Sequence, residues 1–351
     1  MKVLVGMSGG VDSSAAALLL RDAGHEVVGV TLRLWGGESD TGCCSVSDVD
    51  DARRVAQQIG IDHVVFNYAD EFARAVVDPY VAAHGRGDTP NPCIECNRHL
   101  KFDALLARGR VLGFDAVATG HHARIETIDG LHRVVRGADT AKDQSYVVHM
   151  IRGDALGEVL FPVGAMDKAR VRALAAAAGL RTAAKPDSQD VCFIGSTVGR
   201  AGFLAGRLDM HPAEVVDESG TVRGEVPAVE LVTVGQRRGL GLSGGGPHYV
   251  VDVDVPARRV TIGPPERLLC DETRLTSMAW PHAGDEERIS NGEVLVQSSA
   301  HGARARARVR VEDGGAVVEW IAPQRRIAPG QTVVFYDATD RAVLGGGIAT
   351  A

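Results

Sequence analysis

The first half of the chain alternates short β-branched runs with alanine-rich segments, and this alternation restricts the fold more than any other feature. It predicts strands at residues 2–6, 26–34, 63–67 and 116–119, and helices at residues 13–22 and 49–58. Gly24 and Gly60 follow the two helices, where a left-handed cap is favoured. Strands and helices that alternate in this way form a parallel sheet with covering helices. We therefore predict a doubly wound α/β domain over residues 1–195.

Beyond Gly195 the pattern changes, because glycine and proline interrupt short apolar runs. The runs at residues 214–216, 230–233, 248–253 and 259–262 predict a small, strand-rich central domain over residues 196–270. From residue 271 onward, apolar and polar residues alternate at period two, as they do in half-buried antiparallel strands. These runs lie at residues 294–298, 304–311, 316–320 and 332–336. They predict a small C-terminal β-barrel domain over residues 271–351.

The composition is that of a globular protein with several domains. A chain of 351 residues exceeds one ordinary hydrophobic core, and its 45% hydrophobic and 24% charged residues favour neither disorder nor a membrane protein. No apolar run is long enough to span a bilayer, and residues 1–5 lead directly into a strand without a secretory signal. We therefore expect a cytoplasmic protein with no membrane partner. The net charge of −7 argues against a chain that is basic overall, but leaves a local nucleic-acid-binding patch open.

Residues 3–14 place a Gly-Gly turn and several hydroxyl side chains between an apolar strand and the start of a helix. That order points backbone N–H groups and the positive end of the helix at an anion. Glycine lets the backbone approach phosphate oxygens, Ser8 and Ser13 can donate hydrogen bonds, and Asp12 can hold Mg²⁺. The ending of the Walker loop and the spacing of the dinucleotide fingerprint are both missing. We interpret the loop as a phosphate cradle of another type; the alternative is an ordinary glycine turn capped by serine.

The cysteines are scattered along the chain and do not form a disulfide framework. They are Cys43, Cys44, Cys93, Cys96, Cys192 and Cys270. In its proline-rich loop, the Cys93-x-x-Cys96 pair could be half a zinc site, a redox pair, or a nucleophile beside a bystander. No second pair has the spacing of a zinc ribbon, which argues against structural zinc. Cys192 stands between acidic residues and an aromatic, which leaves a buried core thiol and a reactive thiol equally open.

The order of these motifs resembles that of a known enzyme family. The string from Ser8 to Ser13 resembles the pyrophosphate loop of the ATP pyrophosphatase superfamily, whose members typically adenylate a carbonyl oxygen. Nine blocks in the same order, over essentially the whole chain, resemble bacterial tRNA-specific 2-thiouridylases of the MnmA type. The blocks are 6–14, 89–92 with 96–97, 118–121, 142–146, 161–164, 187–188 with 192–195, 235–237 with 239–241, 329–331 and 344–348.

The resemblance implies an ATP-dependent and Mg²⁺-dependent transferase without a prosthetic group. It would adenylate the 2-carbonyl of the wobble uridine in tRNA and replace that oxygen with sulfur, releasing AMP and pyrophosphate. The implied ATP-binding residues are Gly6, Met7, Ser8, Gly9, Gly10, Val11, Asp12, Ser13, Leu32 and Gly120, with Asp12 also as the Mg²⁺ ligand.

The resemblance also implies roles for two cysteines. Cys192 would receive sulfur as a persulfide from a sulfur-relay protein or cysteine desulfurase, and the persulfide would attack the activated carbon. Cys96 would then act as the nucleophile that frees the sulfur, leaving a Cys96–Cys192 disulfide that a reductant must reopen. The alternative is that hydrosulfide is released and attacks the carbon itself.

A third implication concerns the anticodon arm of tRNA. The residues implied to line the flipped base or contact the RNA are Asn91, Pro92, Cys93, His121, Lys142, Asp143, Gln144 and Gln331. The chain departs from the family at two places. Cys93 stands where some relatives have an aspartate that can be viewed as a proton donor. The resemblance therefore does not identify the general acid of this chain. Residues 298–301 replace an Arg-Tyr-Arg patch, although four arginines at period two could serve instead; the alternative is a solvated strand face. They are Arg304, Arg306, Arg308 and Arg310.

Two other function classes compete with this interpretation. One is an ATP-dependent ligase or amidotransferase of the same superfamily, which would adenylate a small metabolite and would not need its cysteines. The other is a non-catalytic, zinc-stapled RNA-binding protein, which would bind stoichiometric zinc and would not cleave ATP. The phosphate loop makes the second of these the weakest.

Overall fold

The computed structural model describes residues 1–35, 46–187, 191–195, 197–242 and 248–351. Cys43, Cys44 and Ser188 therefore lie outside the described residues. The chain divides into two compact units. Unit 1 comprises Met1–Val77, Pro92–Gly199 and Asp340–Val343, and unit 2 comprises Asp78–Asn91, Arg200–Thr339 and Leu344–Ala351.

Unit 1 is built on a five-stranded parallel sheet in the order β3-β2-β1-β4-β7. Its strands are β1 (Lys2–Gly6), β2 (Glu26–Arg33), β3 (Asp62–Asn67), β4 (Ala116–Ala118) and β7 (Val159–Leu160). The chain runs outward from β1 in one direction and then crosses to β4 on its other side. This reversal confirms the predicted doubly wound α/β fold, and it puts the switch in strand order, where ligands of such folds bind, at the carboxyl ends of β1 and β4.

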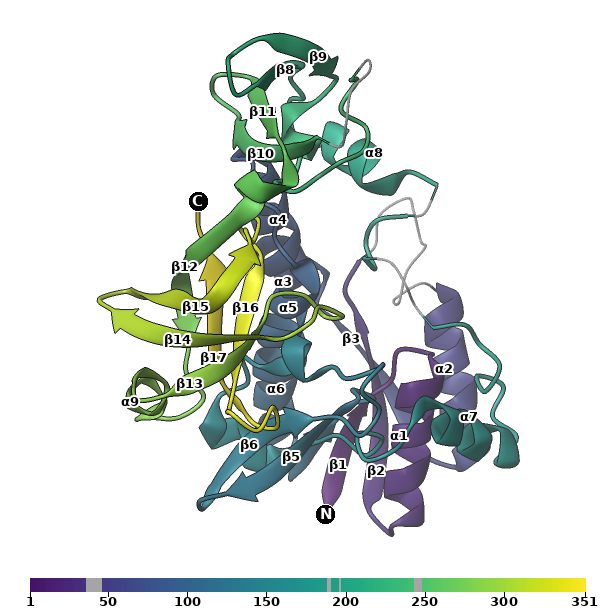
Figure 1. Ribbon diagram of the computed structural model, residues 1–351. Coiled ribbons are helices and arrows are strands. Elements are labelled where there is room, and N and C mark those ends of the chain that lie inside the picture. Colours follow the sequence, from purple (N-terminus) through teal and green to yellow (C-terminus); the bar gives the residue numbers. More distant parts are fainter. Residues whose placement is uncertain (36–45, 188–190, 196, 243–247) are drawn as a thin grey trace. The chain divides into compact units, whose positions relative to one another are not determined.

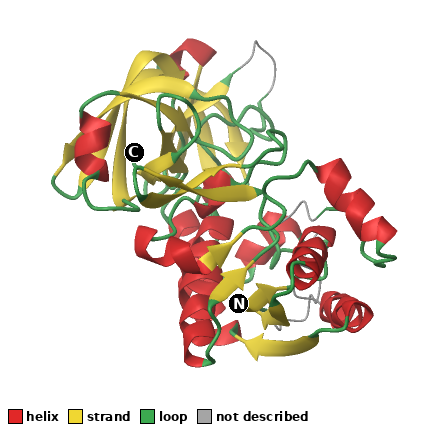
Figure 2. Cartoon of the chain, turned by 90° about the horizontal axis from the view of Figure 1, so that it is seen from below, coloured by secondary structure: helices red, strands yellow, loops and turns green. Residues whose placement is uncertain are grey.

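Helices cover both faces of this sheet (Figures 1 and 2). On one face lie α1 (Val11–Asp22), α2 (Val46–Ile59) and α7 (Lys168–Ala177). Their shared buried cluster includes Val3, Val5, Ala16, Val55 and Val171. Leu4 points to the opposite face, as period two requires, and there it meets Gly109 of α6 (Leu105–Val111). Gly24 and Gly60 have φ of 81° and 70°, which confirms the predicted left-handed caps of α1 and α2.

Shorter elements complete unit 1. They are α3 (Ala69–Phe72), the π-helices η1 (Ala73–Val77) and η2 (Cys96–Ala104), α5 (Pro92–Glu95), the hairpin β5 (Ala123–Ile128) and β6 (Leu131–Arg136), and the 3-10 helices η3 (Ser145–Val148) and η4 (Gly153–Glu158). The hairpin carries Arg136, which is 7% exposed and bridges two carboxylates. Its Nη1 donates to Asp143 over 2.7 Å and its Nη2 to Asp340 over 2.6 Å. The segment Asp340–Val343 thereby belongs to unit 1 and supplies the second carboxylate partner of Arg136.

The first part of unit 2 contains α4 (Asp78–Gly85) and a four-stranded sheet in the order β10-β11-β8-β9, to which α8 (Gly199–Ala205) leads. Its strands are β8 (Ala213–Asp217), β9 (Val222–Val226), β10 (Tyr249–Asp254) and β11 (Arg259–Gly263). The strand expected at residues 230–233 is wrong, because this segment begins in the 3-10 helix η5 (Val229–Leu231). Val229 and Val232 both enter the core at a spacing of three. In a strand, residues three apart point to opposite faces, so both valines could not enter the same core. The buried Glu230 between them accepts a hydrogen bond from His211 Nδ1 over 2.8 Å.

The rest of unit 2 confirms the predicted β-barrel. After η6 (Pro265–Leu268), six strands close in the order β12-β15-β14-β13-β16-β17. The elements are β12 (Leu269–Ala279), α9 (Asp285–Ser290), β13 (Glu293–Gln297), β14 (Ala305–Glu312), β15 (Gly315–Arg325), β16 (Thr332–Tyr336) and β17 (Val343–Ala349). Along β14 the inward Ala307 and Val309 alternate with exposed arginines. Closure leaves these barrel strands without unpaired edges.

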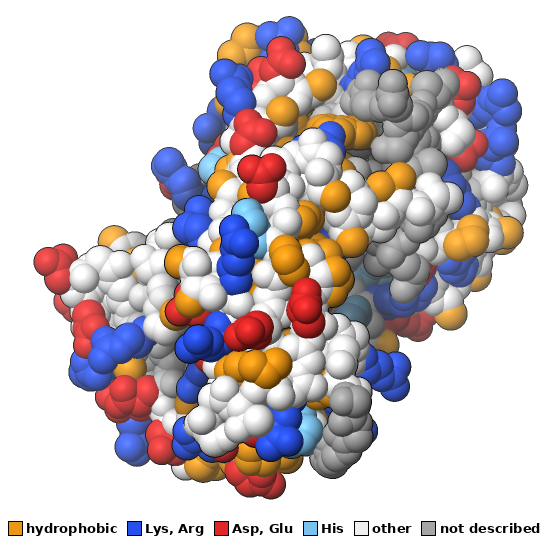
Figure 3. Space-filling view, turned by 90° about the horizontal axis from the view of Figure 1, so that it is seen from above, with side chains coloured by type: hydrophobic (Ala, Val, Ile, Leu, Met, Phe, Trp, Pro, Cys, Tyr) orange, Lys and Arg blue, Asp and Glu red, His pale blue; other side chains and the backbone are white. Residues whose placement is uncertain are grey.

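The exposed surface mixes both signs of charge. Figure 3 shows Lys and Arg side chains interspersed with Asp and Glu on the face that it draws. On β14, Arg306 and Arg308 lie 2.9 and 3.5 Å from Glu293, and Arg310 lies 3.2 Å from Glu319. Arg306, Arg308 and Arg310 therefore share an exposed face of β14 with glutamates beside them, whereas Arg304 precedes the strand. In the described part of the chain, none of the helices has both the length and the apolar character that a bilayer crossing requires.

Candidate active site

The loop between β1 and α1 keeps a helix N-terminus accessible to an anion. Gly9 has φ of 71°, and a Cβ there would lie 2.4 Å from the carbonyl oxygen of Asp48. Gly10 is the N-cap of α1 and has no side-chain cap hydrogen bond. The first backbone N–H groups of a helix have no intrahelical acceptors, so an uncapped start of a 12-residue helix can bind an anion.

Hydroxyl side chains hold this loop in shape. The backbone N–H of Ser8 donates to Ser13 Oγ over 3.2 Å, and Ser13 Oγ donates in turn to the carbonyl of Gly10 over 3.2 Å. Ser14 Oγ donates to the same carbonyl over 2.8 Å and accepts from Thr182 over 3.0 Å. Ser13 and Ser14 are both buried. These serines therefore order the loop, which leaves backbone N–H groups and Ser8 as its donors toward a ligand.

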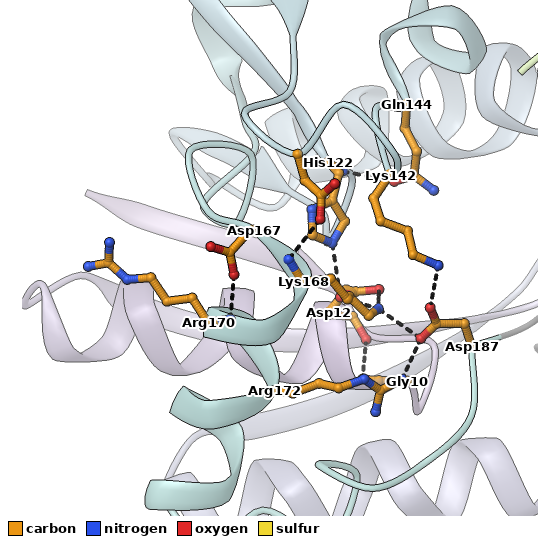
Figure 4. A network of polar contacts seen from close by, with 12 residues as sticks. Gly10, Asp12, His122, Lys142, Gln144, Asp167, Lys168, Arg170, Arg172 and Asp187 are labelled. Atoms are coloured by element: carbon orange, nitrogen blue, oxygen red, sulfur yellow. Dashed lines mark hydrogen bonds and ion pairs between the residues drawn. The ribbon is translucent and has the colours of Figure 1, made fainter. Parts of the chain in front are cut away.

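Asp12 lies in the first turn of α1 and contacts two basic side chains (Figure 4). Lys168 Nζ donates to both of its carboxylate oxygens over 2.7 Å, and His122 Nε2 lies 3.1 Å from Oδ1. Burial alone would raise the pKa of Asp12, but the hydrogen bonds with His122 and Lys168 outweigh it and hold that pKa below its ordinary value. The carboxylate is charged and 30% exposed, which suits a ligand of Mg²⁺.

A second carboxylate, Asp187, contacts three cations beside the loop (Figure 4). They are Lys142 at 2.9 Å, Lys168 at 2.8 Å and Arg172 at 2.7 Å. Burial would raise the pKa of Asp187, but the hydrogen bonds from Lys168 and Lys142 dominate and hold it well below the ordinary value. Lys185 also contacts the loop, because its Nζ donates to the carbonyl of Gly9 over 3.0 Å, and it is paired with Asp48 at 2.6 Å and Asp51 at 2.8 Å. Several cations therefore lie beside the loop, each with a carboxylate partner.

The other predicted ATP residues lie at the carboxyl ends of neighbouring strands. Met7 follows β1, and its carbonyl accepts from Thr31 Oγ1 over 2.8 Å. Leu32 is near the end of β2 and is 8% exposed. Gly120 follows β4, and a Cβ on it would lie 2.5 Å from the backbone nitrogen of Ser13. The structure therefore places these residues, like the loop, at the carboxyl ends of the strands where the strand order reverses.

The predicted tRNA residues after the hairpin differ in their exposure. Lys142 has a side chain that is 40% exposed. Asp143 is buried, and it accepts from Arg136, from the backbone N–H of Gly137 over 2.8 Å and from Ser145 Oγ over 2.9 Å. Gln144 is clamped to His122 by two hydrogen bonds, of 2.8 and 2.9 Å, that involve the His122 backbone. Asp143 and Gln144 therefore fix the conformation of the loop that carries Lys142.

Two further predicted RNA contacts, His121 and Gln331, also have partners within their own units. His121 is buried between Phe102 and Phe161, and its Nδ1 lies 2.7 Å from Thr119 Oγ1. Gln331 Nε2 donates to the carbonyl of Thr89, in the loop that leads to Asn91. Their roles toward RNA stay predictions.

The cysteines predicted to react both lie in unit 1. Cys96 begins the π-helix η2 and is 6% exposed, Cys192 is half-buried, and Cys93 in α5 is exposed. Phe193, next to Cys192, packs edge-on against Phe72 with ring centroids 5.5 Å apart, which anchors that segment. Over the described ranges, no three His, Cys, Asp or Glu side chains gather as a zinc site made of protein ligands would need.

Several site residues were missed by the sequence interpretation. They are His122, Lys168, Arg172 and Lys185. Their contacts span long separations, such as the 156 residues between Asp12 and Lys168, so no local spacing reveals them. One feature could have indicated a role for Lys168. It is the first residue of a helix, where the helix dipole disfavours a cation, so stability alone does not explain a lysine there.

Comparison with known proteins identifies relatives over the whole chain. The family described as "tRNA methyl transferase HUP domain" matches residues 1–196, "tRNA methyl transferase PRC-barrel domain" matches 201–264, and "Aminomethyltransferase beta-barrel domain" matches 271–349. The tRNA-specific 2-thiouridylase MnmA of Roseiflexus sp. (strain RS-1) is 43% identical, covering 99% of this chain and 98% of that protein. The protein of the same name from Chloroflexus aggregans is 45% identical, with 98% and 97% covered. That from Mycolicibacterium smegmatis is 44% identical, with 96% and 95% covered.

Proposed function

The chain belongs to the tRNA-specific 2-thiouridylase family, and from that premise we propose that it replaces the 2-carbonyl oxygen of the wobble uridine in tRNA with sulfur, driven by ATP. One observation carries the proposal beyond the family likeness. The uncapped N-terminus of α1 and its surrounding cations lie in the same unit as Cys96 and Cys192. A phosphate-binding helix start and two thiols are the parts that adenylation and sulfur transfer need.

In the first step, the α1 N-terminus and the lysines near it bind the phosphates of ATP. The uracil 2-oxygen attacks the α-phosphate, and pyrophosphate leaves. This converts the oxygen into part of an AMP leaving group. Asp12 would hold Mg²⁺, which supplies positive charge to neutralise the phosphates. Gly120 lets the chain pass close to Ser13, so the strand end and the loop form one surface for the nucleotide.

In the second step, a persulfide on Cys192 attacks the activated carbon, and AMP leaves. A sulfur-relay protein or a cysteine desulfurase supplies the outer sulfur of that persulfide. The Cys96 thiolate then attacks the inner sulfur of Cys192, so the outer sulfur stays on the base and a Cys96–Cys192 disulfide forms. A cellular reductant restores both thiols. Release of hydrosulfide, which then attacks the carbon, is the competing order and forms the same disulfide.

The tRNA partner would approach through its anticodon arm, where the wobble base is already single-stranded and inexpensive to extrude. Lys142 offers an exposed ammonium group for a phosphate, and Cys93 offers an exposed thiol beside Pro92. Asn91, His121 and Gln331 complete the proposed contact set, with Asp143 and Gln144 as the residues that shape the Lys142 loop. The proposed setting is the cytoplasm, where a reductant is abundant.

The test is thiolation of an unmodified tRNA transcript by the purified protein with ATP, Mg²⁺, a reductant, and a cysteine desulfurase with cysteine. We expect a sulfur-for-oxygen gain in RNA mass, retardation on a mercury gel and formation of AMP. Cys96→Ser and Cys192→Ser should abolish sulfur transfer, whereas Cys270→Ser, a half-buried thiol in the barrel, serves as the matched control. AMP formation without sulfur in the RNA would instead favour the ligase of a small metabolite.

A further inference from the structure

Lys168 occupies a position that stability alone does not favour. It is the first residue of α7, at the positive end of that helix, and its side chain is only 12% exposed. The N-cap carboxylate of Asp167 accepts from the backbone N–H of Arg170 over 2.7 Å, while Asp139 accepts from the backbone N–H of Lys168 over 3.0 Å. The backbone of Lys168 is therefore fixed, and its ammonium group is held in a position where it needs an anion.

The ammonium group of Lys168 lies beside the start of a second helix. It contacts both oxygens of Asp12 in the first turn of α1, over 2.7 Å (Figure 4). An anion bound at the uncapped N-terminus of α1 would lie within a turn of Asp12, and thus within reach of Lys168. The uncapped start of α1 and the ammonium group of Lys168 converge on this place, which favours a multiply charged anion.

Asp187 is the group that holds these cations in the structure. Its carboxylate contacts Lys142, Lys168 and Arg172, and Asp12 also contacts Lys168, so three cations share two carboxylates. The three partners are not equivalent. Arg172 Nη1 also donates to the carbonyls of Ala183 and Lys185 over 2.8 and 2.9 Å, so its position does not depend on Asp187. A lysine ammonium group, in contrast, can turn to a new acceptor.

We propose that Lys168 binds the β- and γ-phosphates of the nucleotide, and that Asp187 is an internal anion that competes with them for Lys168. This inference rests on the proposed use of ATP. When the polyphosphate binds, Lys168 exchanges Asp187 for phosphate oxygens. Arg172 stays paired with Asp187, so the exchange leaves no carboxylate without a cation. Lys168 is then a nucleotide-binding residue and Asp187 a residue that sets its affinity.

Calorimetric titration of the full chain with inorganic pyrophosphate, in the absence of Mg²⁺, isolates this contact. Lys168→Met keeps the aliphatic stem and removes the charge, so it should weaken pyrophosphate binding by about 10-fold to 100-fold. Asp187→Asn and Asp187→Ser remove the competing anion and should strengthen binding by about 3-fold to 10-fold. Titration with AMP, which lacks the β- and γ-phosphates, should show little change in any of the three.

Arg170→Ala is the matched control. It removes one positive charge from the same turn of α7, but Arg170 is exposed and its side chain points away from the cluster in Figure 4. Its pyrophosphate affinity should equal that of the wild type. Equal binding by Lys168→Met and Arg170→Ala would overturn the role of Lys168. Weaker binding in both Asp187 variants, with thermal unfolding unchanged, would overturn competition. If the wild type binds neither pyrophosphate nor AMP, the proposed use of ATP fails, and this inference fails with it.

Discussion

Lowering the pH from 7 to 5 should destabilise unit 1 through the buried imidazole of His149. This residue is 1% exposed, and its Nδ1–H donates to the carbonyl of Tyr146 over 2.9 Å. Burial lowers the pKa of His149 from 6.5 to about 4; the Tyr146 hydrogen bond opposes the shift and the charge of Arg98 adds to it. At neutral pH the folded protein therefore holds His149 uncharged.

The sign of the effect follows from proton binding. Between pH 6.5 and about 4, the unfolded chain binds a proton at His149 that the folded chain does not bind. The free energy of unfolding is therefore highest above pH 6.5, decreases as the pH falls, and levels off below about 4. The difference between the pKa values of His149 in the unfolded and folded chain corresponds to about 3 kcal/mol of unfolding free energy. About 2 kcal/mol of this is lost between pH 7 and pH 5.

Hydrogen-exchange mass spectrometry at both pH values measures this loss for each unit separately. After correction for intrinsic exchange, the most protected amides of unit 1 should lose protection by about 30-fold for each such histidine. His149→Asn keeps a donor for Tyr146 but cannot be protonated, so it should remove that share of the pH response. His121 should retain part of the response, because burial holds its pKa well below the ordinary value.

The matched control is His84→Asn. Burial also lowers the pKa of His84 to about 4, but His84 lies in unit 2, so its substitution should change the pH response of that unit. An undiminished pH response of unit 1 in His149→Asn would refute the reasoning.

Three further predictions concern single side chains. Arg136→Met should lower the free energy of unfolding in urea by about 3–5 kcal/mol, because Asp143 stays buried without its cation. Adding Asp143→Asn should recover part of that loss, and strictly additive losses would contradict the explanation. Gly120→Ala should abolish nucleotide binding in calorimetry, because its Cβ would lie 2.5 Å from the backbone nitrogen of Ser13; wild-type affinity would show that the loop adapts. Glu293→Gln removes the charge beside Arg306 and Arg308 and should steepen the salt dependence of tRNA binding, whereas an unchanged slope would identify a solvated strand face.

Local patterns predicted most of the fold and the loop of the site. The strand, Gly-Gly turn and helix at residues 3–14 are contiguous, so their order alone indicates where a phosphate can bind. The alternation along β14 likewise follows from a two-residue period. In contrast, residues 230–233 were assigned to a strand, because four residues of mixed polarity do not distinguish a strand from a 3-10 turn.

The polar network of the site could not be predicted in the same way. Asp12, Lys168 and Asp187 meet only because the parallel sheet and its covering helices bring distant segments together. Charged residues are usually exposed, so the sequence gives no sign that Asp143 is buried against Arg136; its role toward RNA stays a prediction of the family resemblance. The family resemblance supplied the expected roles of the cysteines, which local chemistry had left open.

The inclusion of Asp340–Val343 in unit 1 has a consequence for synthesis on the ribosome. Apart from these residues, unit 1 ends at Gly199, so the polypeptide must be extended by 140 residues before Asp340 is made. At elongation rates of about 5–20 residues per second this takes roughly 7–28 s. Throughout that interval Arg136 lacks one of its two carboxylates, Asp340, while Asp143 remains its partner. The last step in closing the interior of the N-terminal half is therefore timed by translation of the C-terminal barrel, and a premature stop before codon 340 would leave that half incomplete.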